Sequence, residues 1–230
     1  MAIYVISDLH LSFGVNKPMD IFGDKWKGYE EKIKKDWLEK VKEDDYVIMA
    51  GDFSWATYLE EAIEDFKFLN ELPGKKIILK GNHDYWWETV TKMNKFLKEN
   101  KFENIYFLYN NCIETDEYLI CGTRYWTEEE GQPNDKIFNR EIQRAKISLN
   151  EAVQINKEII ETDYGKNKEI IMVTHYPPDN LLLNAIKEYD IKIWIYAHIH
   201  SNYEASMVQI DGIESYLTSC DYLDFKLMKI

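Results

Sequence analysis

The segment IYVISDLH, residues 3–10, contains the pattern that organises the whole chain. Its first four residues are apolar, as is typical of a strand that is buried on both faces of a sheet. Asp8 and His10 follow directly. Because they are two residues apart, their side chains project to the same side of an extended backbone. A carboxylate and an imidazole placed together at the end of a buried strand indicate a chemical site at that end.

Four other apolar runs end in the same way: YVIMAGD (46–52), KIILKGNHD (76–84), EIIMVTH (169–175) and IKIWIYAHIH (191–200). In open α/β sheets, ligand sites gather at the carboxyl ends of strands, so five adjacent strands would place these polar groups around one crevice. The chain has five histidines, and all of them lie at these ends: His10, His83, His175, His198 and His200. One such histidine could be an ordinary hydrogen-bonded residue, but packing alone does not account for all five.

The residue types at these ends are those that bind metal ions. Imidazoles mixed with carboxylates suit Mn, Fe or Zn better than Mg or Ca. No cysteine lies beside them, which argues against a structural zinc site. Two carboxylates, neutral imidazoles and one amide would leave two divalent ions incompletely neutralised, ready for a hydroxide and a phosphate. Two neighbouring metals can hold both the attacking and the leaving oxygen of a phosphoryl displacement.

Strand patterns alternate with helical ones along most of the chain. Strands are predicted at 3–7, 46–50, 76–79, 118–121, 169–173 and 192–196, and helices at 29–42, 57–72, 89–100 and 137–161. This alternation predicts a sheet flanked by helices, and 230 residues suit a single α/β domain, 1–230.

The end of the chain and two loops have other patterns. Asp211-Gly212, between the segments 203–210 and 213–218, predicts a β-hairpin, and a final strand is expected within 224–230. Residues 11–28 and 123–136 show no periodicity, and both are candidate substrate loops.

The five blocks DLH (8–10), GDFS (51–54), GNHD (81–84), TH (174–175) and AHIH (197–200) resemble the calcineurin-like metallophosphoesterase superfamily. Its pattern is D-x-H, G-D, G-N-H-D/E, H and G-H-x-H, in that order, and here it covers nearly the whole chain. A single D-x-H means little, whereas the ordered set is highly specific. The resemblance implies an α/β fold, a four-layer α/β/β/α sandwich with mixed central sheets and a metal site at the carboxyl ends of strands.

The resemblance also implies roles for individual residues. Asp52 would bridge two divalent or trivalent metal ions, one of them held also by Asp8, His10 and His200 and the other by Asn82, His175 and His198. His83 would be the catalytic histidine, giving a proton to the leaving oxygen or steadying the phosphoryl group, and Asp84 would orient it through a hydrogen bond. A metal-bound hydroxide would be the nucleophile.

Two departures from the family pattern bear on the activity. Ala197 stands where the last block usually has glycine, which we expect to cost only a slight backbone adjustment. The second block reads GDFSWAT and lacks the arginine of the phosphoprotein-phosphatase branch. The resemblance therefore implies a hydrolase of small phosphomonoesters or phosphodiesters, nucleotide-like ones included, and gives no support for a protein phosphatase. A nuclease acting on short nucleic acid is the alternative, and a catalytically weak scaffold is a further one.

Composition limits the partners. The net charge of −13 makes extended nucleic acid an unsuitable partner, because phosphate backbones are bound by excess positive charge. No apolar run is long enough to span a membrane, and the first residues are expected to form a strand and not a signal peptide. The three cysteines match no zinc or redox motif, so we expect free thiols in the cytoplasm. The oligomeric state is left open.

Three further residues are candidate substrate contacts. Trp55 and Trp86 fall beside the site blocks, where their rings could stack on a planar group or could simply pack the loops. Arg124 follows a predicted strand, where it could bind a phosphate or form a surface salt bridge. The sequence does not decide between these readings.

Overall fold

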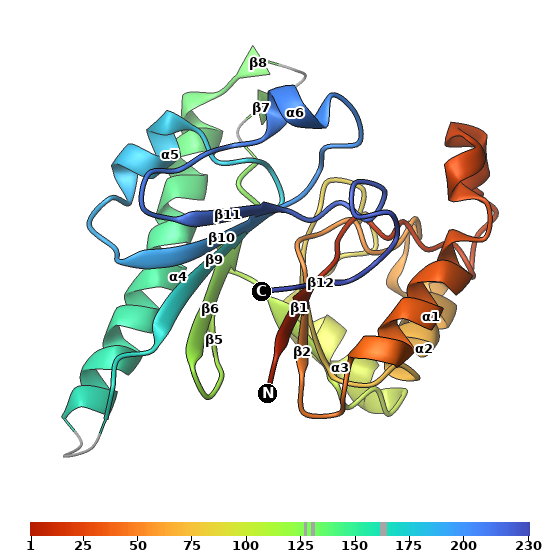
Figure 1. The fold of residues 1–230 in the computed structure, drawn as a ribbon, viewed down its shortest axis with the longest axis horizontal. Helices are drawn as coiled ribbons and strands as arrows, with labels where there is room; N and C mark the ends of the chain where they lie inside the picture. The colour runs from red at the N-terminus through yellow and green to blue at the C-terminus, as the bar shows by residue number, and fades with distance from the viewer. Residues whose placement is uncertain (127, 130–131, 162–164) are drawn as a thin grey trace.

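The computed structural model describes residues 1–126, 128–129, 132–161 and 165–230, and these build two five-stranded sheets between layers of helices (Figure 1). The first sheet has the order β12-β1-β2-β3-β4. Its strands are β1 (Ile3–Val5), β2 (Tyr46–Met49), β3 (Lys75–Leu79), β4 (Ile105–Leu108) and β12 (Met228–Lys229). Strands β1 to β4 are parallel, and β12 adds to β1 in the antiparallel direction.

The second sheet has the order β11-β10-β9-β6-β5. Its strands are β5 (Cys112–Glu114), β6 (Tyr118–Thr123), β9 (Glu169–Thr174), β10 (Ile191–Tyr196) and β11 (Glu214–Leu217). All pairs are parallel except β5 with β6. Both sheets are therefore mixed, as predicted, but the five site-bearing strands are divided between them, three in the first sheet and two in the second.

Helices cover the outer face of each sheet. The first sheet packs against α1 (Tyr29–Lys40), α2 (Ile63–Asn70) and α3 (Val90–Glu99), and the second against α4 (Asp135–Ile160) and α5 (Asn180–Ala185). Three short 3₁₀ helices, η1 (Met19–Phe22), η2 (Asp24–Trp26) and η3 (Leu59–Ala62), and the single-turn helix α6 (Tyr203–Ser206) lie in connections. The chain thus has the predicted four-layer α/β/β/α arrangement (Figure 1).

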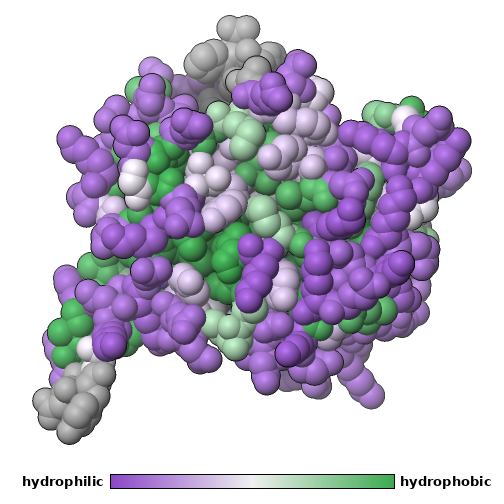
Figure 2. Space-filling view, in the orientation of Figure 1, coloured by the Kyte–Doolittle hydropathy of each residue, from purple (hydrophilic) through white to green (hydrophobic). Residues whose placement is uncertain are grey.

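Three apolar clusters correspond to the three interfaces between these four layers. Along β2, Val47 and Met49 face the helices, while Ile48 faces the second sheet. The middle cluster consists almost entirely of aliphatic strand residues from both sheets, such as Val5, Ile77 and Ile195. Strands buried on both faces need continuous apolar runs, which is why the runs were visible in the sequence. On the face drawn in Figure 2, hydrophilic residues gather on both sides and hydrophobic residues are visible between them.

The predicted hairpin around Asp211-Gly212 is wrong. Gly212 does form a turn with φ of +75°, and Ile210 and Ile213 make one antiparallel bridge. However, β11 pairs in parallel with β10, and residues 203–206 are helical. The open edge of the second sheet offers a longer ladder than a local hairpin could. The predicted final strand is present as β12, whereas β4, β5 and α5 were not predicted.

The two predicted loops are only partly regular. Residues 11–28 contain the two 3₁₀ helices η1 and η2. Within 123–136, β7 (Glu128–Glu129) pairs with β8 (Gln132–Pro133), and residues 127, 130 and 131 lie outside the described residues. No helix in the described part of the chain is long and apolar enough to cross a membrane.

Candidate metal centre

The backbone turns sharply where the site-bearing strands end. Asp8, His10, Asp52 and His198 all have positive φ, between 46° and 73°, which is the left-handed region. For residues other than glycine this conformation costs about 1–2 kcal/mol each. Hydrogen bonds between the loops hold it, since Asp8 N–H donates to the Gly51 carbonyl at 3.0 Å and His10 N–H donates to that of Asp52 at 2.9 Å. The strain turns the side chains inward, as is found at functional sites.

Gly51 makes the close approach of the two sheets possible. Its φ is +112°, and a Cβ built there would lie 2.5 Å from Nδ1 of His175 and 2.7 Å from Cα of Gly81. Any side chain at residue 51 would therefore push His175 out of the site.

Asp8, His10 and His200 form one group of ligand atoms, which all lie within 4.8 Å of one another. The Nε2 atoms of His10 and His200 face each other at 3.4 Å. Asp8 and His10 are buried and His200 is partly exposed, so this group is open on one side. The geometry is that of three ligands to one cation.

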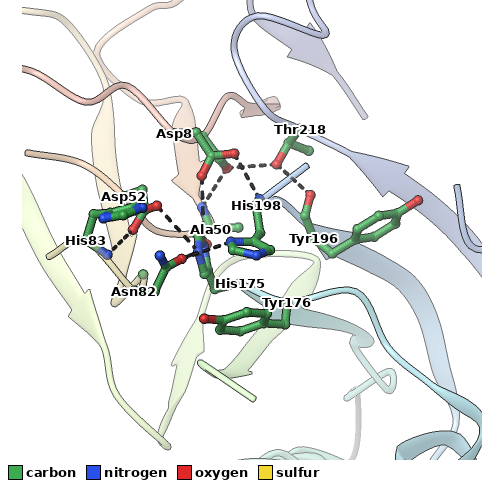
Figure 3. Close-up of polar contacts among 12 residues, drawn as sticks. Asp8, Ala50, Asp52, Asn82, His83, His175, Tyr176, Tyr196, His198 and Thr218 are labelled. Atoms are coloured by element: carbon green, nitrogen blue, oxygen red, sulfur yellow. Dashed lines mark hydrogen bonds and ion pairs between the residues drawn. The ribbon is translucent and has the colours of Figure 1, made fainter. Parts of the chain in front are cut away.

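Asp52, His175 and His198 form the second group, again with ligand atoms within 4.8 Å. Asn82 joins them, because its Oδ1 lies 2.6 Å from Nε2 of His175 and 2.9 Å from Nδ1 of His198 (Figure 3). Figure 3 shows these side chains pointing toward one another from the ends of different strands. Four ligands of mixed type therefore converge on a second point.

Asp52 connects the two groups. Its Oδ2 lies 3.8 Å from Nε2 of His10 and 3.6 Å from Nε2 of His175, and these two nitrogens belong to different groups. Its other oxygen, Oδ1, accepts a hydrogen bond from the backbone N–H of His83 at 2.8 Å. One carboxylate thus has one oxygen fixed and the other placed between two ligand sets.

The donor set fits cations. Within the described residues, Asp8 Oδ1 and Asp52 Oδ2 are buried and accept no hydrogen bond. Burial raises the pKa of Asp8 to about 7 and that of Asp52 to about 6, and it lowers the pKa of His175 and of His198 to about 3. Buried carboxylates that face neutral imidazoles are costly unless a cation offsets their charge. The arrangement therefore suits bound metal ions.

Hydrogen bonds fix which nitrogen of two histidines points inward. Nδ1 of His175 donates to the Ala50 carbonyl at 2.9 Å, which leaves Nε2 for the centre. Nδ1 of His200 donates to Asp221 Oδ1 at 2.9 Å, again leaving Nε2. Such outer partners orient metal-binding histidines and raise their basicity.

Asp221 was not identified from the sequence. Its side chain has no exposed surface, and it also accepts from Lys25 Nζ and the Tyr203 hydroxyl, both at 2.6 Å. Although burial opposes ionisation, the hydrogen bonds from His200, Lys25 and Tyr203 lower its pKa to about 2. Asp221 follows β11 in no recognisable motif, so the pattern of the other blocks gave no signal for it.

Asp84 does not have the role predicted for it. Its carboxylate makes no hydrogen bond to the His83 ring, whose buried Nδ1 has no partner among the described residues. Asp84 Oδ2 instead accepts from the backbone N–H of Asp52 and Gly81, and Oδ1 accepts from those of Phe53 and Ser54 and from the Trp86 indole. Asp84 therefore holds the loops after β2 and β3 together and does not orient the ring of His83.

The two candidate tryptophans lie in different environments. Trp55 is half-buried, and its ring packs against those of both His10 and His83, with centroids at 4.8 Å and 4.6 Å. Trp86 is fully buried in the core between the first sheet and its helices. The predicted substrate contact by Trp86 is thus wrong, because its ring faces no solvent.

A pocket of about 460 Å³ opens beside the first group of ligands. His10, His83 and His200 line its inner side, and Trp55 lines it as well. The loop 11–28 contributes Met19, Phe22, Lys25 and Trp26 to its wall, and Ser201 and Asp221 complete it. This pocket combines aromatic surface with the edge of the metal centre.

Arg124 lies outside that pocket. It lines a second cavity of about 430 Å³, and its guanidinium stacks on Trp126 at 4.7 Å. Its backbone carbonyl accepts a hydrogen bond from His175 N–H at 3.3 Å, so it adjoins the second group of ligands. Its positive charge lowers the pKa of Asp52, although burial of that carboxyl is the larger effect and raises it.

Comparisons with known proteins agree with this geometry. The family model described as calcineurin-like phosphoesterase matches residues 1–202. A protein of unknown function from Aquifex aeolicus has a similar fold, with a TM-score of 0.55 and 20% identity over 99% of this chain and 95% of its own. A Thermus thermophilus protein has a TM-score of 0.57 and 13% identity over 99% and 97%. No curated protein sequence matches the chain. At these identities the two structures show a shared fold.

Proposed function

The chain belongs to the calcineurin-like phosphoesterase family, and on that premise we propose that it hydrolyses small phosphomonoesters or phosphodiesters at a centre of two metal ions. One observation carries the proposal. Asp52 Oδ2 lies buried and without a hydrogen bond between Nε2 of His10 and Nε2 of His175, so that it joins two convergent ligand sets. A carboxylate oxygen between two ligand sets is expected of a two-metal site and not of a single-metal or purely structural site.

We propose the following ligands for the two metals. Asp52 would contact both ions, one held also by Asp8, His10 and His200 and the other by Asn82, His175 and His198. Imidazole-rich sets with carboxylates favour Mn, Fe or Zn. Such ions lower the pKa of water toward neutrality and offset charge on phosphoryl oxygens.

His83 is the proposed proton donor to the leaving oxygen. Its backbone is fixed to Asp52, and its ring packs on Trp55 and lines the pocket beside the first ligand set. A leaving group seated in that pocket would therefore have its oxygen next to an imidazole. Loss of a well-placed general acid typically costs a factor of about 10²–10⁴ in rate.

The lining of the pocket also indicates the chemical nature of the leaving group. Trp26, Trp55, Met19 and Phe22 offer an apolar, partly aromatic wall, which suits a planar group such as a nucleoside. Lys25 adds a cation, although it is already paired with Asp221 at 2.6 Å. We therefore propose a nucleotide-like substrate. The net charge of −13 disfavours long nucleic acid, so a nuclease would be limited to short pieces.

We also propose a reducing, cytoplasmic setting. The three cysteines are free and buried, which is the usual state of thiols in the cytoplasm.

A metal-supplemented screen tests the proposed function. Wild-type protein with Mn²⁺ is assayed on aryl phosphomonoesters, aryl phosphodiesters, nucleotides and short single strands, beside His83→Ala, Asp52→Asn and the surface control Asp44→Asn. We expect turnover of at least one small ester, its loss with chelator, and losses of 10²-fold or more in the two site variants only. Wild-type rates in His83→Ala and Asp52→Asn would refute the proposal.

A further inference from the structure

The second cavity, of about 430 Å³, gathers an unusual amount of positive charge. Lys80, Arg124, Arg140 and Arg144 all line it, and these include all three arginines of the chain. The whole protein carries a net charge of −13. Chance placement on such an acidic chain would not be expected to bring its arginines to one cavity.

Two of these cations form no ion pair with a described residue. Within residues 1–126, 128–129, 132–161 and 165–230, no carboxylate oxygen lies within 4.0 Å of a side-chain nitrogen of Lys80 or Arg124. Both are half-buried, and both line the same cavity. Half-buried like charges are unfavourable unless an anion lies between them.

The acidic residues at the cavity are already engaged. Glu141 is fully buried, and its Oε1 accepts from Arg144 at 2.6 Å and lies 3.6 Å from Arg140 Nε. Glu88, which lines the cavity whereas Glu141 does not, pairs with Lys92 at 2.8 Å. The cavity therefore keeps an excess of positive charge, which attracts and concentrates anions.

The cavity adjoins the second ligand set of the metal centre, whereas the aromatic pocket adjoins the first. Lys80 is two residues before the ligand Asn82, and the Arg124 carbonyl bonds the backbone of the ligand His175. The aromatic pocket, by contrast, is lined by His10 and His200 of the other ligand set. A substrate held at the metals therefore has an apolar wall beside one ligand set and a cationic wall beside the other.

We propose that the cavity of Lys80, Arg124, Arg140 and Arg144 binds a second phosphate group of the substrate while the scissile phosphate lies at the metal centre. Guanidinium groups match phosphate oxygens in a bidentate manner and stay charged at all physiological pH values. The substrate class is thus an organic bisphosphate, such as a nucleotide with phosphates at two positions. This inference rests on the proposed function for the location of the scissile phosphate.

Binding separates this inference from catalysis. Titration calorimetry on Mn²⁺-loaded His83→Ala protein, which holds its ligand without rapid turnover, compares adenosine 5′-monophosphate with adenosine 3′,5′-bisphosphate. The same comparison is made after adding Arg140→Met or Lys80→Met, and after adding the control Lys157→Met. Lys157 lies on α4 like Arg140 but outside the cavity, so it removes one charge of the same sign. Thermal unfolding checks that each variant is folded. If Lys80→Met does not fold, the test relies on Arg140→Met, because Arg140 is half-exposed.

We expect the bisphosphate to bind about tenfold or more tightly than the monophosphate, an advantage that Arg140→Met and Lys80→Met abolish and Lys157→Met keeps. Equal affinity for both nucleotides, or an advantage that survives in the cavity variants, overturns the proposal. Inorganic phosphate, which can also occupy the metal centre, gives a second check. If one ion binds per chain and Arg140→Met leaves its affinity unchanged, the cavity is filled only by a phosphate that is part of a substrate held at the metals. If a second ion binds and Arg140→Met removes it, the cavity serves a free anion and the proposal is wrong. Absence of hydrolysis in the ester screen would refute the activity without touching this binding result.

Discussion

Asp84 Oδ2 accepts a hydrogen bond from the backbone N–H of Asp52 at 2.9 Å, and the same oxygen accepts from Gly81 N–H at 2.7 Å. One fully buried carboxylate thus ties the loop that carries Asp52 to the loop that carries Asn82 and His83. Burial raises the pKa of Asp84 to about 7, while its N–H donors stabilise the charged form. The position of Asp52 relative to both ligand sets depends on this contact.

Asp84→Asn should therefore weaken both the fold and metal binding. The amide puts an NH₂ group opposite N–H donors, which leaves buried donors unsatisfied and costs about 2–3 kcal/mol in unfolding free energy. Urea denaturation measures that loss, and titration with Mn²⁺ measures the affinity, which we expect to fall 10- to 100-fold. The exposed control Asp44→Asn should change neither by more than about 0.5 kcal/mol. An Asp84→Asn protein with wild-type metal affinity would show that the contact has no bearing on the centre.

Asp221→Asn tests the orientation of His200. An amide is a weaker acceptor for Nδ1–H, so we expect Mn²⁺ affinity to fall about 10-fold or more, with a smaller loss of stability than for Asp84→Asn. Asp224→Asn is the matched control, because Asp224 lies nearby in sequence and its ion pair is with exposed Lys226. If the two variants bind Mn²⁺ equally well, Asp221 does not position its histidine.

Trp86→Phe and Trp55→Phe should have different effects. Trp86 is buried and donates to Asp84, so its replacement should lower stability by about 1–3 kcal/mol and leave KM unchanged. Trp55 lines the pocket, so its replacement should raise KM for a nucleotide several-fold with little effect on KM for a small alkyl phosphate. Steady-state kinetics on both substrates decide this, and a KM change for Trp86→Phe would restore it as a substrate contact.

The burial of Lys76 should make the free energy of unfolding depend on pH, independently of the metal centre. It is fully buried in β3, its ammonium donates to the Leu72 carbonyl, and burial lowers its pKa to about 8. Below pH 8 the folded protein bears the full cost of the buried charge. Between pH 8 and the usual value of 10.5, the unfolded chain binds more protons than the folded one, so this contribution to stability rises with pH.

We therefore expect Lys76→Met to be more stable than wild type at pH 7, by at most roughly 3 kcal/mol. The gap should narrow as pH rises from 8 to 10. Urea denaturation of both proteins across this range measures the gap, with exposed Lys67→Met as a control that shows no such trend. A gap that stays constant with pH would mean that Lys76 is not a buried charge at pH 7.

The sequence predicted the strands and their ends well because strands buried on both faces require unbroken apolar runs. The run 169–173 stands out for this reason and appears as β9, Glu169–Thr174. Parallel strands also place their carboxyl ends together, so the polar residues that follow the apolar runs could be grouped into one candidate site from the sequence. The division of these strands into two sheets was not visible locally, because it depends on which strands pair and not on any one run.

The errors share one cause, which is contact between segments that are distant in the chain. Asp211-Gly212 forms its turn, but β11 gains more by extending β10. Asp221 reaches His200 across 21 residues. Asp84 stands next to His83 in sequence, yet its carboxylate faces the opposite loop. Only the fold shows which neighbours these side chains have.

The number of Mn²⁺ ions bound per chain tests the central claim most directly. Elemental analysis after equilibrium dialysis should find two ions in the wild-type protein and in Asp44→Asn. Asp52→Asn should bind both ions far more weakly, because its carboxylate oxygen is shared by the two ligand sets. One ion or none in the wild type, or two ions held with undiminished affinity by Asp52→Asn, would contradict a two-metal centre joined by this residue.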